Sequence, residues 1–489
     1  MKNKSLKINA IFNVIRIAMS IIFPLITYPY ASRVLGVDNI GKVQFATSVI
    51  TFFSLLAALG VSSYAVRECS SIRNDRKKIS EFASQIFTIN FLFTIITYFL
   101  MFLVLLLPTK LKFYYILILI QSISLILTTL GVEWVFIIYE DYFYITLRVI
   151  LTQVISLVLL FIFVRKEGDF YIYAMITVFA SSITNIFNFF YSKKYIDLKL
   201  TKNMGIKTHL KPMFTLFSNN LAQHIYINSD VVMLGFFTND FFVGIYTLST
   251  KIYIIIKQLI NAIIAVTIPR LSYLRDKNGE ELKQKNNSIL NVCILILFPA
   301  IIGLFLLSDR IVLLIGGKKF ISGGISLKIL SISLLFAVLS NFFVNATLIV
   351  HREDKKVLQA TIIGAIANFS LNFIFIPLWQ ERGAAITTVI SEATVFMVSL
   401  IASLKYVSFK NIFESLGQST IGCILIFLIY TFIDKMSLPN YMILFLTIGA
   451  SVIAYFILLL IFRNKYLIII LDSLKNKFNS ITKRKKVIK

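Results

Sequence analysis

The stretch VGIYTLSTKIYIIIKQLI, from Val243 to Ile260, sets the class of this chain. Apart from Gln258 and two lysines, Lys251 and Lys257, its side chains are apolar or hydroxylic. The run is long enough for a helix that crosses a bilayer, where each charge costs a few kcal/mol. The stretch therefore predicts a membrane-spanning helix whose two lysines have a partner or a function.

The whole composition agrees with a protein that crosses a membrane many times. Of 489 residues, 58% are hydrophobic and 15% are charged, whereas roughly 25% of residues are charged in soluble domains. The net charge of +26 comes from Lys and Arg in short segments between apolar runs, as is typical of cytoplasmic loops beside anionic lipid. Since no soluble basic domain is present, nucleic acid is not an expected partner.

Catalytic and metal-binding patterns are absent from the sequence. The few cysteines and histidines are scattered singly, which predicts neither a disulfide framework nor a metal site or triad. An acidic segment with Glu133, Glu140 and Asp141 has two interpretations, a pair of catalytic carboxylates or a solvated loop. Because no nucleophile or histidine lies nearby, we expect a solvated loop. We expect no metal and no cofactor.

Charged and Pro/Gly-rich breaks divide the chain into about fourteen apolar spans, each near the ~20 residues that a bilayer requires. They are residues 9–31, 41–64, 80–107, 113–137, 142–164, 170–192, 211–235, 241–268, 287–307, 323–349, 356–377, 383–404, 415–433 and 440–462. The first run contains Arg16 and lacks an A-x-A-like end, so we expect a retained span rather than a cleaved signal. With the N-terminus inside, the cytoplasmic segments hold about three times as many Lys and Arg as the opposite loops, which predicts that both termini are cytoplasmic.

A weak internal repeat organises these spans. The Leu-Gly pair at 35–36 and the following Gly41 correspond to the pair at 234–235 and Gly244. Two halves of six spans, with two spans appended, explain this pattern. Because six is even, the repeat is parallel, with its axis along the membrane normal and the binding site between the halves. The expected parts are an N-lobe (1–200), a C-lobe (201–410), two further spans (411–465) and a basic cytoplasmic tail (466–489).

Four spans carry polar residues along one helical face, which marks the side turned toward protein or water. They are the first two spans of each half, and we infer that they line a shared, hydrated central cavity. For the serines and threonines alone, helix-to-helix hydrogen bonding is the alternative. The expected cavity residues that bind substrate are Arg16, Asn219, Gln223, Tyr253, Lys257 and Asn261. Together with Lys251 and Asp230, the charges of these spans sum to a net positive cavity that prefers an anion.

The charged residues inside spans leave alternatives open. Arg16, Arg148 and Lys328 lie near span ends, so each could extend to the membrane surface instead of serving a site. Asp230 and Lys251 fall at similar depths on adjacent antiparallel spans, where a structural ion pair and a direct role are equally open.

Lys257 lies near the middle of the membrane, and the sequence offers no evident carboxylate partner for it. We therefore expect it to bind substrate or to couple transport. Glu392 is the other deep carboxylate, for which a proton relay and pairing with Arg or Lys are both open. Pro24 and Pro29 in the first span predict either a gating kink or a static bend.

Several segments resemble one family. They are PLITYPYASRVLGVDNIG (24–41), ALGVSSYAVRE (58–68), DVVMLGFF with VGIYTLSTK (230–251) and TIPRLS (267–272). These segments are similar to those of the bacterial Wzx-type oligosaccharide flippases, polysaccharide transporters of the multidrug/oligosaccharidyl-lipid/polysaccharide (MOP) exporter superfamily. The resemblance covers roughly the first 400 residues and implies an all-α, MATE-like fold of two six-helix lobes.

The resemblance also implies a function. Such a flippase moves undecaprenyl-pyrophosphate-linked oligosaccharide repeat units, as for O-antigen or capsule, from the cytoplasmic to the outer leaflet of the bacterial cytoplasmic membrane. Alternating access would be driven by H⁺ or Na⁺ or by membrane potential, and a polysaccharide polymerase and glycosyltransferases would be partners. A cationic cavity suits a pyrophosphate, and Asn, Gln, Thr and Tyr suit sugar hydroxyls. Lys257 is the first candidate ligand for the pyrophosphate.

Three other functions compete with this one. A peptidoglycan lipid precursor flippase would share both fold and cargo chemistry. A MATE-like ion-coupled antiporter of drugs or cations should have an anionic cavity, whereas this sequence predicts a cationic one. A membrane-embedded glycan polymerase or ligase would need a sizeable outer loop with catalytic residues, and no acid/base constellation is present.

Overall fold

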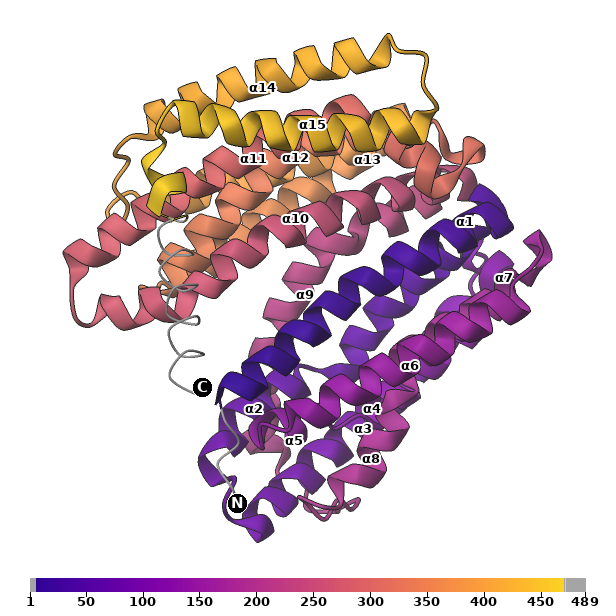
Figure 1. Cartoon of the computed structure of the whole chain (residues 1–489). Coiled ribbons are helices and arrows are strands. Elements are labelled where there is room, and N and C mark those ends of the chain that lie inside the picture. Colours follow the sequence, from indigo (N-terminus) through magenta and orange to yellow (C-terminus); the bar gives the residue numbers. More distant parts are fainter. Residues whose placement is uncertain (1–5, 470, 472–489) are drawn as a thin grey trace, which may run out of the picture. The chain divides into compact units, whose positions relative to one another are not determined.

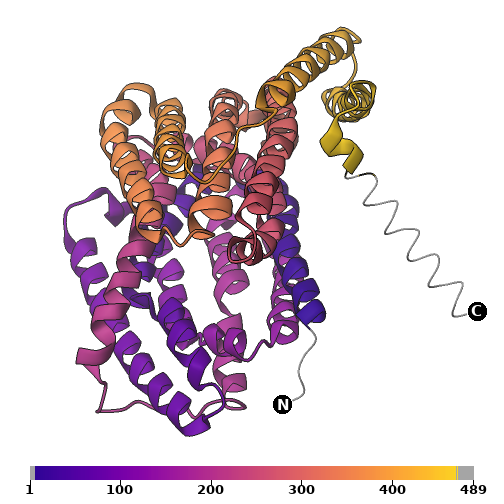
Figure 2. The same ribbon diagram turned by 90° about the vertical axis from the view of Figure 1, so that its left-hand side faces the viewer.

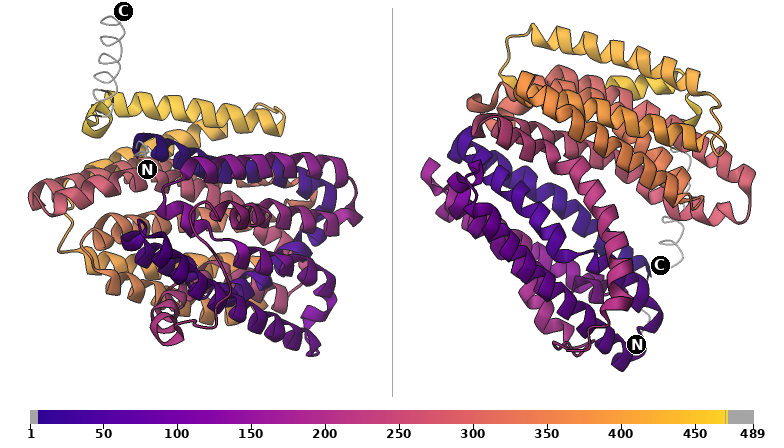
Figure 3. Two further views of the ribbon diagram at one scale, coloured as in Figure 1. Left: turned by 90° about the horizontal axis from the view of Figure 1, so that it is seen from below. Right: turned by 180° about the vertical axis from the view of Figure 1, so that it is seen from behind.

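The computed structural model describes residues 6–469 and residue 471. Every regular element in these residues is a helix (Figures 1 and 3). The elements are α1 (Leu6–Ala58), α2 (Val61–Ile72), α3 (Arg76–Leu106), η1 (Lys110–Tyr114), α4 (Tyr115–Leu130), α5 (Glu133–Ile138), α6 (Tyr142–Phe163), η2 (Glu167–Asp169), α7 (Phe170–Ser182), α8 (Thr184–Ser192), α9 (Ile206–Phe237), α10 (Asp240–Arg275), α11 (Gly279–Gly316), η3 (Lys318–Phe320), α12 (Gly323–Asn341), η4 (Phe342–Ile349), α13 (Asp354–Ser403), α14 (Ile412–Asp434) and α15 (Asn440–Ile461).

The helices confirm an integral membrane protein. Eleven helical stretches of the described residues are long and apolar enough to cross a membrane. Two of them, Ile11–Ile72 and Asp354–Ser403, each contain two of the predicted spans. The predicted span at 211–235 lies within α9. The all-helical, polytopic class is confirmed, and the number fourteen stays a prediction.

Two long helices are interrupted at particular residues. In α1 the backbone of Gly36 is non-helical, with φ 77° and ψ 176°, a region that glycine enters without a steric penalty. In α13 the interruption falls at Trp379 and Gln380. α1 continues through Pro24 and Pro29, so the described break of this helix lies beyond both prolines, at the glycine. Gating by the prolines stays a prediction.

Two predicted spans are each divided into two helices. The span at 113–137 becomes α4 and α5, because the chain turns at Gly131. A Cβ at this glycine would lie 2.3 Å from Asn185 Oδ1, so a larger residue would force the Asn185 side chain to move. The span at 170–192 becomes α7 and α8, which meet at Ile183. Apolar periodicity could not predict these turns, since both flanking segments are equally apolar.

The chain forms two compact units. The first consists of the chain up to Thr247 and of two later segments, Ile315–Phe320 and Phe369–Ala384. A buried apolar core joins its helices α2, α3, α5 and α9, with Ile79, Phe136 and Phe217 among its members. Helix α1 packs against α3, α4, α6 and α9. Burial of these apolar side chains holds the helices of this unit together.

Within the first unit, the two glycines of the predicted repeat make reciprocal contacts. A Cβ at Gly41 would lie 1.9 Å from the carbonyl oxygen of Asp240, and a Cβ at Gly244 would lie 2.2 Å from that of Val37. The glycines are 203 residues apart, and so are Val37 and Asp240. A reciprocal contact of this kind is what a twofold axis between repeats produces. Small residues here let the start of α10 approach α1 at backbone distance.

The second unit comprises Leu248–Leu314, Ile321–Asn368 and the chain from Ala385 onward. In it α14 and α15 form a helical hairpin (Figures 1 and 2). The hairpin packs on α11 through Leu295, Leu459 and Tyr466, and the Tyr455 hydroxyl donates a hydrogen bond of 2.7 Å to the Leu295 carbonyl. These contacts attach the two C-terminal helices to the rest of the unit.

An acidic group at the start of α13 organises a loop of the second unit. Glu353 Oε1 accepts a hydrogen bond of 2.5 Å from the Tyr406 hydroxyl and lies 3.2 Å from Nζ of both Lys356 and Lys405. The tyrosine bond, followed by the two lysines, lowers the pKa of Glu353 to about 2. This carboxylate therefore stays charged at neutral pH and ties α13 to the segment after it.

Candidate functional site

Lys257 and Glu392 form an ion pair inside the second unit. Lys257 Nζ lies 2.6 Å from Glu392 Oε1, and the two side chains are 25% and 6% exposed. Lys257 belongs to α10 and Glu392 to α13, so the pair joins helices that are distant in sequence. The expectation that Lys257 lacks a carboxylate partner is therefore wrong. Of the two alternatives left open for Glu392, pairing with a lysine is the one observed.

Hydroxyl groups surround this pair. The Tyr253 hydroxyl donates to Glu392 Oε1 at 3.4 Å and lies 3.2 Å from Ser333 Oγ. The Tyr253 ring centroid is 5.6 Å from Lys257 Nζ, close enough for a cation–π contact. Tyr253 precedes Lys257 by one helical turn, so the polar stripe predicted for α10 places both on one face. Sequence reasoning missed Ser333, one of several serines of α12.

One hydrogen bond joins Lys257 Nζ to Glu392 Oε1. An ammonium group donates up to three hydrogen bonds, and one carboxylate oxygen occupies only part of this capacity. Lys257 therefore keeps donor capacity beyond its bond to Glu392, and the carboxylate also accepts from the Tyr253 hydroxyl. Among the described residues, no group of three His, Cys, Asp or Glu side chains is arranged to hold a metal ion.

In the first unit, Asp230 is the centre of a second polar network. It is 4% exposed and accepts hydrogen bonds from the Tyr246 hydroxyl at 2.6 Å and from Asn372 Nδ2 at 2.7 Å. Neither donor is among the predicted site residues, although Tyr246 belongs to the predicted polar stripe of its span. Lys251 belongs to the second unit, and its predicted pairing with Asp230 stays a prediction.

Arg16 takes part in a charged cluster of the first unit. Its NH1 lies 3.9 Å from Glu133 Oε1, and its NH2 donates to Asn13 Oδ1 at 3.0 Å. Arg148 also pairs with Glu133 and is only 6% exposed. Arg148 is thus buried and paired rather than extended to the membrane surface.

The acidic segment that the sequence predicts to be a solvated loop is instead fully partnered. Besides Glu133, Glu140 pairs with Arg73 at 3.2 Å, and Asp141 is 3% exposed and accepts a hydrogen bond of 2.7 Å from the Tyr195 hydroxyl. The partners come from other helices. The prediction of a solvated segment is wrong for Asp141, which is buried, whereas the side chains of Glu133 and Glu140 are 36% and 40% exposed.

The remaining predicted cavity residues differ in their surroundings. Gln223 is exposed, whereas Asn261 has a buried Oδ1 without a hydrogen-bond partner in the described part of the chain. The side chain of Asn219 lies outside the described residues. A site that unites all six predicted residues therefore stays a prediction.

The ion pairs also bear on the prediction of a net positive cavity, because the basic residues have carboxylate partners. Besides the pairs above, Lys328 lies 2.6 Å from Asp309. Arg16, Arg148, Lys257 and Lys328, which all lie inside predicted spans, thus have a carboxylate within 4 Å. A substrate anion must compete with these carboxylates instead of meeting free cations.

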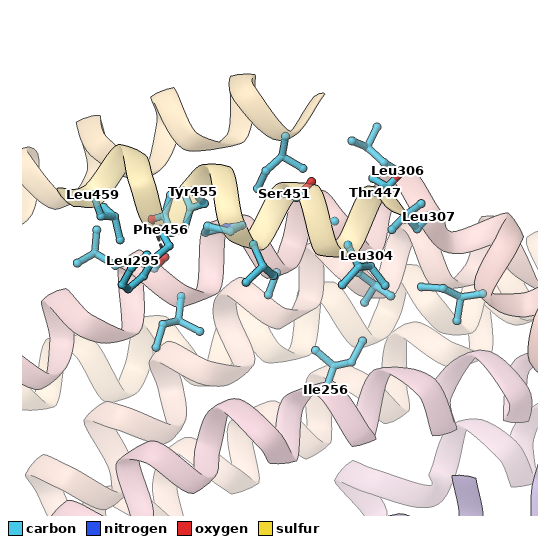
Figure 4. A pocket seen from close by; sticks show the side chains of 18 residues that line it. Ile256, Leu295, Leu304, Leu306, Leu307, Thr447, Ser451, Tyr455, Phe456 and Leu459 are labelled. Atoms are coloured by element: carbon cyan, nitrogen blue, oxygen red, sulfur yellow. Dashed lines mark hydrogen bonds between the residues drawn. The ribbon is translucent and has the colours of Figure 1, made fainter. Parts of the chain in front are cut away.

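An apolar pocket of about 520 Å³ lies in the second unit between α11 and α15 (Figure 4). Figure 4 shows Leu295, Leu304 and Leu307 of α11 opposite Thr447 and Tyr455 of α15. Its outer wall includes Val452 and Phe456, which are 63% and 42% exposed and so accessible to lipid. At its floor stands Ile256 of α10, the residue before Lys257. The pocket thus connects a lipid-accessible face with the helix that carries the ion pair.

The sequence matches one protein family and is similar to proteins of known name. The profile of a family described as polysaccharide biosynthesis protein matches residues 6–275. A protein of Escherichia coli (strain K12) named as an O-antigen transporter is 25% identical over 403 residues, which cover 81% of this chain and 96% of that protein.

Two solved structures share the fold. The lipid II flippase MurJ, in an inward closed conformation, has a TM-score of 0.77 at 18% identity and covers 94% of this chain and 100% of its own. An inward-facing multidrug resistance MATE family transporter of the MOP superfamily has a TM-score of 0.61 at 15% identity, with coverages of 80% and 97%. These similarities confirm the predicted MATE-like architecture.

Proposed function

Since this chain belongs to the polysaccharide biosynthesis protein family, we propose that it is a flippase that translocates lipid-linked oligosaccharides across the membrane. The Escherichia coli relative, which matches it over most of both chains, is named a transporter. The chain is accordingly a transporter and not an enzyme. In finer detail, the cargo is an undecaprenyl-pyrophosphate-linked repeat unit that moves from the cytoplasmic to the outer leaflet by alternating access.

The observation that carries this proposal is the Lys257–Glu392 pair with its hydroxyl neighbours. The pair keeps the ammonium group of Lys257 largely shielded from solvent, with a side chain only 25% exposed. A pyrophosphate needs such a donor, and the hydroxyls of Tyr253 and Ser333 suit polar head-group atoms. When the phosphate takes Lys257, Glu392 loses its cationic partner, and ion coupling by H⁺ or Na⁺ through this carboxylate is part of the proposal.

The apolar pocket supports the lipid part of the cargo. Its lipid-accessible wall admits a hydrocarbon chain from the bilayer, and its floor at Ile256 lies one residue from Lys257. Burial of a CH₂ group from water contributes about 0.8 kcal/mol, but a chain that moves from lipid to an apolar pocket gains little. The pocket therefore guides the chain without holding it tightly, as transport requires.

The other predicted site residues have secondary roles in this proposal. Arg16, Asn219, Gln223 and Asn261 would contact the head group, while Asp230 and Lys251 would form a coupling or structural pair. Pro24 and Pro29 would allow α1 to bend, and the lobes would follow the boundaries 1–200 and 201–410 with 411–465 appended. Both termini would face the cytoplasm of a bacterium, and a polymerase and glycosyltransferases would act before and after transport.

The experiment that tests the proposal reconstitutes the purified chain in vesicles loaded with undecaprenyl-pyrophosphate-linked oligosaccharide. The readout is the fraction of glycan that an added, membrane-impermeant lectin can reach. Lys257→Gln should reduce the transport rate at least tenfold, whereas Lys328→Gln, at a second lysine paired at 2.6 Å, should transport normally. Equal rates in empty and protein-containing vesicles would refute the function. Transport of peptidoglycan lipid precursor instead of the oligosaccharide would favour the first competing function.

A further inference from the structure

A second cavity, in the first unit, is lined by none of the residues to which the proposed function assigns a role. It measures about 580 Å³ and lies between α6 and α8, within the ~300–1,000 Å³ typical of ligand pockets. Its walls are aliphatic and aromatic, and Leu147, Leu151 and Phe187 are 43%, 53% and 55% exposed. In a protein whose helices cross a membrane, this exposure opens the pocket to lipid rather than to water.

One buried cation lines this pocket. Arg148 is 6% exposed, and its Nε is buried with no hydrogen-bond partner among the described residues. The Tyr144 hydroxyl beside it is also buried and unpartnered in the described part of the chain, and its ring centroid is 5.8 Å from the guanidinium carbon. Arg148 and Tyr144 both line the pocket, so this cation stands at the edge of the apolar groove.

The end of α8 adds two exposed cations at the pocket. Lys193 Nζ lies 5.6 Å from the ring centroid of Phe190, and Lys194 Nζ lies 5.2 Å from that of Tyr191. Both rings line the pocket. Lys194 Nζ also donates to the Tyr191 hydroxyl at 3.1 Å. A lipid-open pocket therefore carries positive charge where its helix leaves the apolar region.

The charges nearby leave a positive balance. Three cations, Arg148, Lys193 and Lys194, face two carboxylates, because Glu133 pairs with Arg148 and Asp141 accepts from the Tyr191 hydroxyl at 3.3 Å. Basic pockets between membrane helices on the cytoplasmic side are typical sites for anionic lipid head groups. The predicted orientation places this pocket in the cytoplasmic leaflet.

We propose that the pocket between α6 and α8 binds an anionic glycerophospholipid, with its phosphate at Lys193, Lys194 and Arg148 and an acyl chain along Leu147, Leu151 and Phe187. The lipid is a bound companion of the first unit and not the transported cargo. Its phosphate balances the positive charge at this end of the pocket, and its chain fills the exposed groove. Occupancy would stabilise the packing of α8 on α6.

The experiment measures binding of phosphatidylglycerol and of phosphatidylcholine to the purified full-length chain in detergent, by native mass spectrometry. Phosphatidylglycerol should bind at least tenfold more tightly. Leu151→Trp fills the groove and should abolish the preference, whereas Val158→Trp, on the same helix at 50% exposure and outside the pocket, should not. Both positions face lipid, so neither variant should fail to fold.

A second pair of variants tests the charges. Lys193→Ala with Lys194→Ala should weaken phosphatidylglycerol binding about tenfold, and Lys202→Ala with Lys207→Ala should leave it unchanged. Equal binding of the two lipids, or full phosphatidylglycerol binding by Leu151→Trp, would overturn the proposal. Displacement of phosphatidylglycerol by undecaprenyl pyrophosphate from this pocket would also overturn it, because the site would then take the cargo.

Discussion

Replacing Lys257 by methionine removes the ammonium group that lies 2.6 Å from Glu392 Oε1. Loss of one partner of a buried ion pair costs about 3–5 kcal/mol, because the other charge remains unpaired. Here Lys257 is 25% exposed, and Tyr253 still donates to the carboxylate at 3.4 Å. We therefore expect a loss at the lower end, about 3 kcal/mol of unfolding free energy, together with a loss of transport.

The double variant Lys257→Met with Glu392→Leu separates structure from function. Replacing both members of a buried pair by apolar residues is often neutral or stabilising by about 1–4 kcal/mol. The double variant should thus regain the thermal stability of the unmodified protein. Transport should stay at least tenfold reduced, because the phosphate donor is still missing.

The assay pairs thermal unfolding in detergent with the vesicle transport measurement. The matched control is Lys328→Met with Asp309→Leu, a pair with the same 2.6 Å separation but side chains 32% and 51% exposed. Exposed pairs contribute about 0–1 kcal/mol, so neither its single nor its double variant should change either readout. A Lys257/Glu392 double variant that is stable and transports at the normal rate would show that the pair only holds helices together, and the reasoning would fail.

Three further predictions test the fold. Gly41→Ala should destabilise the fold by about 1–3 kcal/mol, because the new Cβ would lie 1.9 Å from a backbone carbonyl oxygen of α10. The control, Gly449→Ala, has open space around the new Cβ and should be neutral or stabilising. Thermal unfolding measures both. In the folded protein the pKa of Glu353 is lowered from 4.5 to about 2. The ionised carboxylate therefore stabilises the fold above pH 4.5, and this contribution is lost as the pH falls toward 2. The melting temperature should drop more steeply on acidification in the unmodified protein than in Glu353→Gln. In a background without native cysteines, Gly168→Cys should react with an impermeant maleimide in intact cells, and Asn278→Cys only after permeabilisation; the reverse pattern would invert the predicted orientation.

The charged residues show what the sequence could predict about the site and what it could not. The depth of a charged residue in the membrane could be predicted from its position within an apolar run. Lys257 and Glu392 both lie near the middle of such runs. Partners could not be predicted, since these two residues are 135 positions apart and Asp230 and Asn372 are 142 apart. Helical periodicity tells which face a residue occupies, and says nothing about which helix packs against that face.

Helix boundaries divide in the same way. The break of α1 at Gly36 coincides with a glycine of the repeat, so a sequence signal for it exists, while the positive φ of 47° at Gln380 has none. The sequence by itself determined the membrane class, the apolar spans, the charge asymmetry of the loops and the family resemblance, because these depend on composition and local pattern. Only the tertiary structure decided that the acidic segment is partnered, that Lys257 is neutralised and that two lipid-accessible pockets exist, because each of these depends on which distant helices meet.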